Sequence, residues 1–177
     1  MNTKMSKLAL AIGALVMAGG AWAADSATAT ATAVVVTPIA IVKSADMVFG
    51  NIVPGNGVVT LSTLAARTKT GTTALSTSGA ASAAAQFTVT GTGANTFAIS
   101  YTGSSATLVN GAETMAIDWI TEVAAAATGK TDEATDATAG TLSSGSAVIW
   151  AGAKLTVGAT QAIGSYTGDL VVTVAYN

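Results

Sequence analysis

The chain has 177 residues, with seven lysines and arginines against nine aspartates and glutamates, and it contains no histidine and no cysteine. This composition excludes Ser-His-Asp and Cys-His catalysis, and also zinc sites built from cysteine or histidine. Phosphate binding needs clustered basic residues, so an acidic and thinly charged chain also argues against a nucleic-acid partner. We therefore expect a protein that is not an enzyme and has no cofactor.

Residues 1–23 have the three parts of a secretory signal peptide. Lys4 and Lys7 form a basic start, residues 8–17 are apolar, and residues 21–23 supply an Ala-Trp-Ala cleavage site. The apolar run is shorter than the stretch of about 20 residues that a membrane span needs. We expect cleavage before residue 24 and secretion to the cell surface or into an extracellular filament. The alternative is an uncleaved membrane anchor, and no later segment is suited to span a membrane.

Residues 24–36 form an N-terminal extension in which small side chains alternate. One face of the extended chain would carry alanines and a valine, and the other would carry threonines. The first face consists of Ala27, Ala29, Ala31, Ala33 and Val35. Such a segment cannot build a core by itself, so we expect a donor strand that joins the sheet of a neighbouring copy. It can instead be an unstructured leader, or an ordinary strand of its own domain.

Residues 37–177 are expected to form one all-β domain, an immunoglobulin-like β-sandwich. Short runs of alternating apolar and polar residues, separated by glycine and small polar residues, are typical of half-buried strands. The expected strands are residues 34–42, 47–52, 57–61, 86–92, 96–101, 114–120, 147–150, 154–157 and 168–176. About nine short strands with regular turns predict a sandwich.

The conformation of three segments between the expected strands can also be predicted. Residues 91–95 read Gly-Thr-Gly-Ala-Asn and predict a hairpin between the strands on either side, because glycine tolerates the positive φ of tight turns. The alanine-rich residues 122–128 are expected to form one or two helical turns that end at Gly129. The polar residues 130–140 predict the most mobile loop of the domain.

The end of the chain predicts an open sheet edge. Leu170, Val172, Val174 and Tyr176 alternate on one face of the last expected strand, and the sequence ends one residue later. An apolar edge strand is prone to pair with another chain, and an extended segment from a neighbour can close it. We therefore expect a groove beside these residues to accept the donor strand. The alternative for Tyr176 is an ordinary aromatic residue of a strand core.

Both ends resemble the fimbrial subunits that are assembled by the chaperone–usher route. Those subunits typically have a penultimate tyrosine and a glycine fourteenth from the end, which Tyr176 and Gly164 match, and an alternating N-terminal extension. The body resembles a group of secreted domains catalogued as domain of unknown function 4402. The matching pieces are Phe49-Gly-Asn-Ile, Phe87-Thr-Val-Thr-Gly, Thr114-Met-Ala-Ile, Gly152-Ala-Lys-Leu-Thr-Val, Gln161-Ala-Ile-Gly-Ser-Tyr-Thr-Gly and Val174-Ala-Tyr-Asn.

The resemblance implies a pilin-like structural subunit that forms a homopolymer by donor-strand complementation. It also implies a periplasmic chaperone that holds the open edge before assembly, and an outer-membrane assembly pore. The chain departs from that pattern in having no cysteine for a disulfide, and in donor side chains that are mostly alanine. A buried alanine methyl contributes about 0.8 kcal/mol, against roughly 1.5 kcal/mol or more for valine. Main-chain hydrogen bonds would therefore supply much of the attachment.

Other candidates have weaker support from the sequence. Asp132, Glu133 and Asp136 offer oxygen ligands for calcium, but their spacing does not match the known calcium loop. Trp119 and Trp150 lie in strand-like runs and are expected in the core rather than on a carbohydrate platform. The alternative function is a monomeric secreted module that folds its first strand into its own sandwich and binds a surface or carbohydrate in adhesion.

Overall fold

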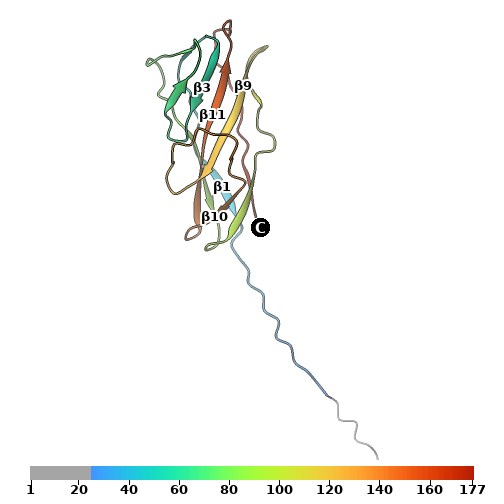
Figure 1. Ribbon diagram of the computed structural model, residues 1–177. Coiled ribbons are helices and arrows are strands. Elements are labelled where there is room, and N and C mark those ends of the chain that lie inside the picture. Colours follow the sequence, from blue (N-terminus) through green and yellow to red (C-terminus); the bar gives the residue numbers. More distant parts are fainter. Residues whose placement is uncertain (1–24) are drawn as a thin grey trace, which may run out of the picture. The chain divides into compact units, whose positions relative to one another are not determined.

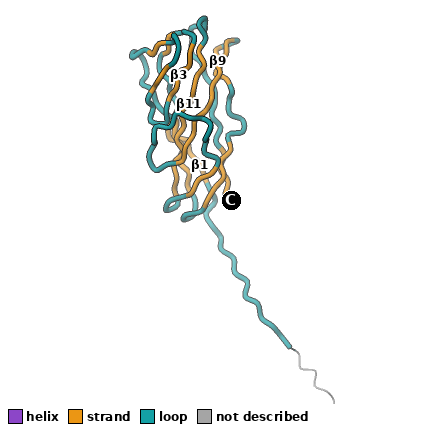
Figure 2. Tube along the Cα trace, in the orientation of Figure 1, coloured by secondary structure: helices purple, strands orange, loops and turns teal. Residues whose placement is uncertain are grey.

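A computed structural model describes residues 25–177, so the expected signal peptide and Ala24 lie outside the described residues. The described chain consists of strands and loops without a helix (Figure 2), which confirms the all-β prediction. Accordingly, none of residues 25–177 belongs to a helix that could cross a membrane. The chain divides into two units, Met1–Val34 and Val35–Asn177.

Twelve strands lie in the second unit. They are β1 (Ala40–Ala45), β2 (Ile52–Val53), β3 (Gly57–Leu61), β4 (Arg67–Lys69), β5 (Ala74–Leu75), β6 (Ala85–Thr90), β7 (Thr96–Ser100), β8 (Thr107–Asn110), β9 (Glu113–Val123), β10 (Ala139–Thr141), β11 (Ser146–Val157) and β12 (Thr173–Tyr176). The short strands β2 and β5 pair only with each other within the described chain.

The largest sheet has seven antiparallel strands, with the long strand β11 at its centre (Figure 1). β11 pairs along one edge with β6 and then with β3, and along its other edge with β9. β1 extends the sheet beyond β6, β4 extends it beyond β3, and β8 pairs with β9. One long strand thus connects both halves of the sheet.

A second sheet of three strands, in the order β10-β7-β12, packs on one half of the large sheet. The side chains that meet between the two sheets form core cluster 1, which contains Ala85, Phe87, Val89, Phe97, Ile99, Leu142, Ile149 and Ala151. The period of two explains this placement, since Phe87 and Val89 of β6 and Phe97 and Ile99 of β7 are buried while their neighbours are not.

The other half of the large sheet carries a second buried group, core cluster 2, which contains Val59, Leu108, Met115, Ile117, Ala153, Leu155 and Val157. All seven belong to β3, β8, β9 or β11, so the three-stranded sheet contributes none of them. The residues that pack on this cluster, among them Phe49 and Tyr166, are only partly buried. The two clusters are buried to a similar degree, with every member at most 8% exposed.

Two of the expected connections are wrong. Residues 91–95 do not form a hairpin, because β6 and β7 belong to different sheets and the turn carries the chain from one sheet to the other. Residues 122–128 are not helical, because β9 runs on to Val123 and an irregular loop follows. The glycines of residues 91–95 do mark a turn, but this turn leads from one sheet to the other, whereas the helical turns predicted from the alanines of residues 122–128 do not form.

Several strand boundaries also differ from the prediction. The first strand begins at Ala40 rather than at residue 34, and residues 47–51 contribute only an isolated bridge between Val48 and Ala83. Residues 147–150 and 154–157 are parts of the single strand β11. The last regular strand is restricted to the final part of residues 168–176. The strands β4, β5, β8 and β10 were not predicted from the sequence.

The loop between β9 and β10 is tied to the domain by hydrogen bonds. The backbone N–H groups of Gly129 and Lys130 donate to the buried hydroxyl of Thr63, at 3.1 and 2.9 Å. Lys130 Nζ donates to the carbonyls of Thr121 and Thr135, at 2.7 and 2.6 Å. These contacts attach the start of the loop to β9 and to the segment after β3, and the expected mobility of residues 130–140 remains a prediction.

Glu122 gives this attachment a dependence on pH. Its carboxylate accepts hydrogen bonds from the backbone N–H of Thr128, at 2.8 Å, and from the hydroxyl of the same residue. Burial raises the pKa of Glu122, but the hydrogen bonds from Thr128 and Thr63 outweigh burial and hold the pKa below 4.5. The stability that this carboxylate adds is therefore complete above the ordinary pKa and is lost as the pH falls through the lowered folded-state pKa.

We expect Glu122→Gln to remove this dependence. The melting temperature of the unmodified protein should exceed that of the variant near about pH 7, and the difference should shrink towards about pH 3. The difference should be small, because Glu122 is only partly buried and solvent screens its charge. Thermal unfolding followed by circular dichroism measures it, with Asp118→Asn, an exposed carboxylate on the same strand, as control. A difference that does not vary with pH would contradict the assignment.

Candidate functional site

Two sheet edges lie next to each other without pairing. Within the described chain, β1 pairs only with β6 at the edge of the large sheet, and β12 pairs only with β7 at the edge of the small sheet. The two strands come close at the end of the domain where β1 begins and the chain ends (Figure 1). At that end the hydroxyl of Tyr176 donates to the carbonyl of Thr37, at 2.9 Å. Such edges present main-chain groups that another strand can use.

Farther along these edges there is a groove of about 830 Å³. One wall is formed by residues 47–54, which follow β1, and the other by residues 161–168, which precede β12. The floor consists of Leu108, Met115, Ile117, Leu155 and Val157 of core cluster 2, together with Trp119. None of the described residues that line the groove is charged. The groove is therefore suited to an apolar or small-residue segment rather than to a charged ligand.

Within the described chain, residues 167–172, which lead from the groove to β12, form main-chain hydrogen bonds along only one of their two edges. Thr167 exchanges two backbone hydrogen bonds with Val109, at 2.8 and 3.0 Å, and the amide of Val171 donates to a serine hydroxyl at 2.9 Å. Among residues 25–177, the amides of Leu170 and Val172 have no hydrogen-bond partner. Successive amides of an extended chain point to opposite sides, so these two face the open edge.

The predicted acceptor residues lie along this open edge. Leu170, Val172, Val174 and Tyr176 are partly buried against core cluster 1. Gly164 lies in the wall of the groove instead, with φ at +155°, and a Cβ there would come within 2.1 Å of Asn110 Nδ2. Glycine therefore allows this segment to pass close to β8. The open volume lies nearer to Gly164 than to the four apolar residues beside which we expected it.

Arg67 holds the wall on the other side of the groove. Its guanidinium donates from Nη1 to the carbonyl of Phe49 at 2.9 Å and to that of Asn51 at 3.3 Å, and from Nη2 to the carbonyl of Ser76 at 2.9 Å. A planar group with several donors can join three carbonyls in this way. This role of Arg67 could not be predicted from the sequence, because a single arginine in a polar stretch follows no pattern.

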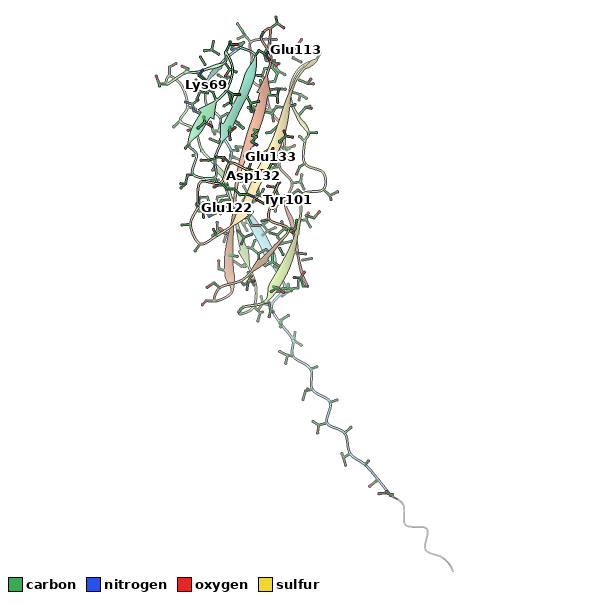
Figure 3. The ribbon with its side chains drawn as sticks, viewed as in Figure 1. Lys69, Tyr101, Glu113, Glu122, Asp132 and Glu133 are labelled. Carbon is green, nitrogen blue, oxygen red and sulfur yellow. The ribbon has the colours of Figure 1, made fainter. Side chains whose placement is uncertain are left out.

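Arg67→Lys is expected to lower the free energy of unfolding by about 2 kcal/mol. A lysine ammonium cannot reproduce the three-way contact, and hydrogen bonds to charged groups contribute about 1.5–3 kcal/mol each. Urea unfolding measures the change. The control is Lys69→Arg, the reverse exchange at an exposed position of β4 (Figure 3), which should stay within about 0.5 kcal/mol. Equal losses in the two variants would show that Arg67 does not hold the wall.

The predicted donor residues are not in regular structure. Residues 25–39 form no strand, and Ala27, Ala29, Ala31 and Ala33 are exposed. Val35, the first residue of the second unit, is 96% exposed. The pairing of these residues with a sheet remains a prediction.

The acidic candidates do not come together as a metal site. Glu133 forms an ion pair with Lys154, whose hydrogen bond lowers the pKa of Glu133. Asp136 accepts a backbone N–H at 2.7 Å and Asp132 accepts another at 2.9 Å. Figure 3 shows Asp132 and Glu133 beside β9, on the face of the domain that also presents Glu122. No group of three His, Cys, Asp or Glu side chains that could hold a metal occurs across residues 25–177.

Both tryptophans are anchored through their indole N–H groups. Trp119 donates to the carbonyl of Ser105 at 2.8 Å, and Trp150 donates to the carbonyl of Ala124 at 3.2 Å. Both are partly buried. Trp119 packs on core cluster 2 beside the groove, so its contribution is to the covering of that core.

Residues 39–176 match the model of a family described as a domain of unknown function, DUF4402. The match covers most of the second unit, including both walls of the groove. No curated protein and no solved structure matches the chain. The resemblance of the two ends to chaperone–usher subunits therefore remains a prediction from the sequence.

Proposed function

The chain belongs to the DUF4402 family, and we propose that this protein is a structural subunit of an extracellular, pilus-like filament. In this proposal the domain is an immunoglobulin-like β-sandwich that lacks one strand. The extension of a second copy supplies that strand and lies in the groove between the segment after β1 and the segment before β12. The donor face is Ala27, Ala29, Ala31, Ala33 and Val35.

The observation that carries the proposal is the groove itself. It lies between residues 47–54, which follow β1, and residues 161–168, which precede β12, it has an apolar floor from core cluster 2, and its lining residues carry no charge. The strands β1 and β12 next to it each have an open edge, and exposed edges are normally covered because they invite pairing with other chains. A single added strand would cover the core and satisfy the amides at Leu170 and Val172.

Small donor side chains suit this arrangement. The floor already carries large side chains, among them Met115, Trp119 and Leu155, so alanine methyl groups can pack on them while the donor backbone stays close to both edges. Each main-chain hydrogen bond adds about 0.5–1.5 kcal/mol net. Several such bonds along the strand would add to the small apolar contribution of alanine and would supply most of the attachment.

Export and assembly complete the proposal. The signal peptide would deliver the chain across the membrane, and a periplasmic chaperone would hold the open groove until an outer-membrane pore passes the subunit on. The chaperone would cover the same groove that the donor strand later fills, because an exposed apolar surface promotes non-specific association.

The test compares the mature chain, residues 24–177, with a form that starts at Thr37. Negative-stain microscopy and size-exclusion chromatography should find filaments or SDS-resistant ladders only for the longer form. A synthetic peptide of residues 27–36 should raise the melting temperature of the shorter form. If both forms are equally stable monomers with or without the peptide, the filament proposal is wrong and a monomeric binding module takes its place.

A further inference from the structure

Three distant parts of the chain meet at the point where the extension joins the domain. The backbone N–H of Thr37 donates to the Thr92 hydroxyl at 2.7 Å, and the Thr37 carbonyl accepts from the Tyr176 hydroxyl at 2.9 Å. The same hydroxyl accepts from the backbone N–H of Thr92 at 2.8 Å. We call Thr37, Thr92 and Tyr176 the root cluster. A Cβ at Gly91 would lie 2.2 Å from the Tyr176 hydroxyl, so glycine keeps room for it.

The residues around this point are poorly suited to a turn. Val34, Val35, Val36 and Thr37 are all β-branched and favour extended backbone. Pro38 restricts the preceding residue to extended conformations as well. Tight hairpin turns need glycine, asparagine or aspartate at positions with positive φ, and residues 33–38 contain none of them.

The distance from the root cluster to the groove also disfavours insertion of the extension into the groove of its own domain. The groove wall ends at Gly168, eight residues before Tyr176, which corresponds to about 26 Å at roughly 3.3 Å per residue. A returning strand would use about eight of the thirteen residues 24–36 to reach the groove, and at least two more to turn. About three residues would then lie inside it. A strand from another copy, entering at the Gly164 end, can fill the whole groove.

We propose that Tyr176, together with Thr37 and Thr92, is a positioning residue that fixes the start of the extension and commits it to a second copy of the chain. The inference rests on the proposed function. A donor that enters at the Gly164 end also runs antiparallel to the last segment. The domain of the copy that supplies the donor then lies at the Gly164 end of the groove. The root cluster of that second copy faces the groove of the first copy. Such a contact is heterologous and leaves one groove open, so it propagates into a filament rather than closing a dimer.

The direct test is Tyr176→Phe in the mature chain, with Tyr101→Phe as matched control. The first variant keeps the ring on core cluster 1 and loses the two hydrogen bonds of the root cluster. The second loses a comparable bond, from the Tyr101 hydroxyl to the Ala137 carbonyl at 2.7 Å. Light scattering after size-exclusion chromatography should find the ratio of polymer to monomer reduced about tenfold for Tyr176→Phe. The Tyr101→Phe protein should polymerise like the unmodified chain.

A second variant tests the same inference without touching the domain core. Val35→Asn with Val36→Gly places a favoured hairpin turn next to Thr37, so more monomer with its own strand folded back is expected. In that monomer the amides of Leu170 and Val172 should become protected from hydrogen exchange. Thr28→Asn with Ala29→Gly, the same change at the far end of the extension, is the control and should not produce a protected monomer.

The possible failures can be told apart. If the unmodified chain polymerises, Tyr176→Phe polymerises like it, and the new turn produces no protected monomer, the root cluster does not direct the strand and only this inference is overturned. If the unmodified chain stays monomeric and removal of the extension changes nothing, the proposed function fails and this inference fails with it.

Discussion

Replacing Ala31 by aspartate is expected to abolish filament formation. Ala31 is at the middle of the proposed donor face, so its side chain would be placed over the floor of the groove. No lysine or arginine lines the groove among the described residues, and the carboxylate would be buried without a partner. An uncompensated buried charge costs about 3–5 kcal/mol. That is at least a hundredfold in the equilibrium between subunits and filament, and electron microscopy of the purified variant measures it.

Thr30→Asp is the matched control, because the adjacent side chain of an extended strand points to the other face. It should stay in water and leave assembly almost unchanged. If Thr30→Asp prevents assembly and Ala31→Asp does not, the threonine face is the inner one and the assignment of faces is wrong. If neither variant has an effect, the extension does not enter a groove.

The alternation of apolar and polar residues correctly predicted the strands in which every second side chain is buried. β3 agrees with residues 57–61, and β7 nearly matches residues 96–101, because Phe97 and Ile99 alternate with small or polar residues. The sequence predicted two strands in place of β11, because Gly152 resembles a break between strands. In the structure a Cβ at Gly152 would lie 2.1 Å from the Leu61 carbonyl oxygen, so this glycine permits close packing of neighbouring strands inside one long strand.

Tertiary pairing was beyond the reach of local patterns. The turn at residues 91–95 has the residues of a hairpin, but which sheet receives β7 depends on contacts with β10 and β12. The same applies to the site. The sequence predicted an open last strand and an extended first segment from the two ends. The wall at residues 47–54 and its support by Arg67 depend on carbonyls that have no signature in the sequence.

Phe97→Ala is expected to lower the free energy of unfolding of the isolated domain by about 3–5 kcal/mol, the usual loss for a fully buried phenylalanine. Phe97 is 0% exposed in core cluster 1. Its ring also lies against Gly140, where a Cβ would come within 2.4 Å of Phe97 Cζ, so no side chain is available there to fill the cavity. Single domains have about 5–15 kcal/mol of stability. Urea unfolding of the form that starts at Thr37 measures the loss, and Val109→Ala, at an exposed site on β8, should change little.

The same variant separates the stability of the core from that of the groove. Phe97 lies in core cluster 1, whereas the floor of the groove is core cluster 2, so the variant should still bind a donor strand. A ligand that binds only the folded state stabilises it by about 2.7 kcal/mol at one hundred times its dissociation constant. The peptide of residues 27–36 should therefore restore more than half of a loss of about 4 kcal/mol. A melting temperature of Phe97→Ala that does not respond to the peptide, in a variant that still folds, would mean that the groove does not accept this strand.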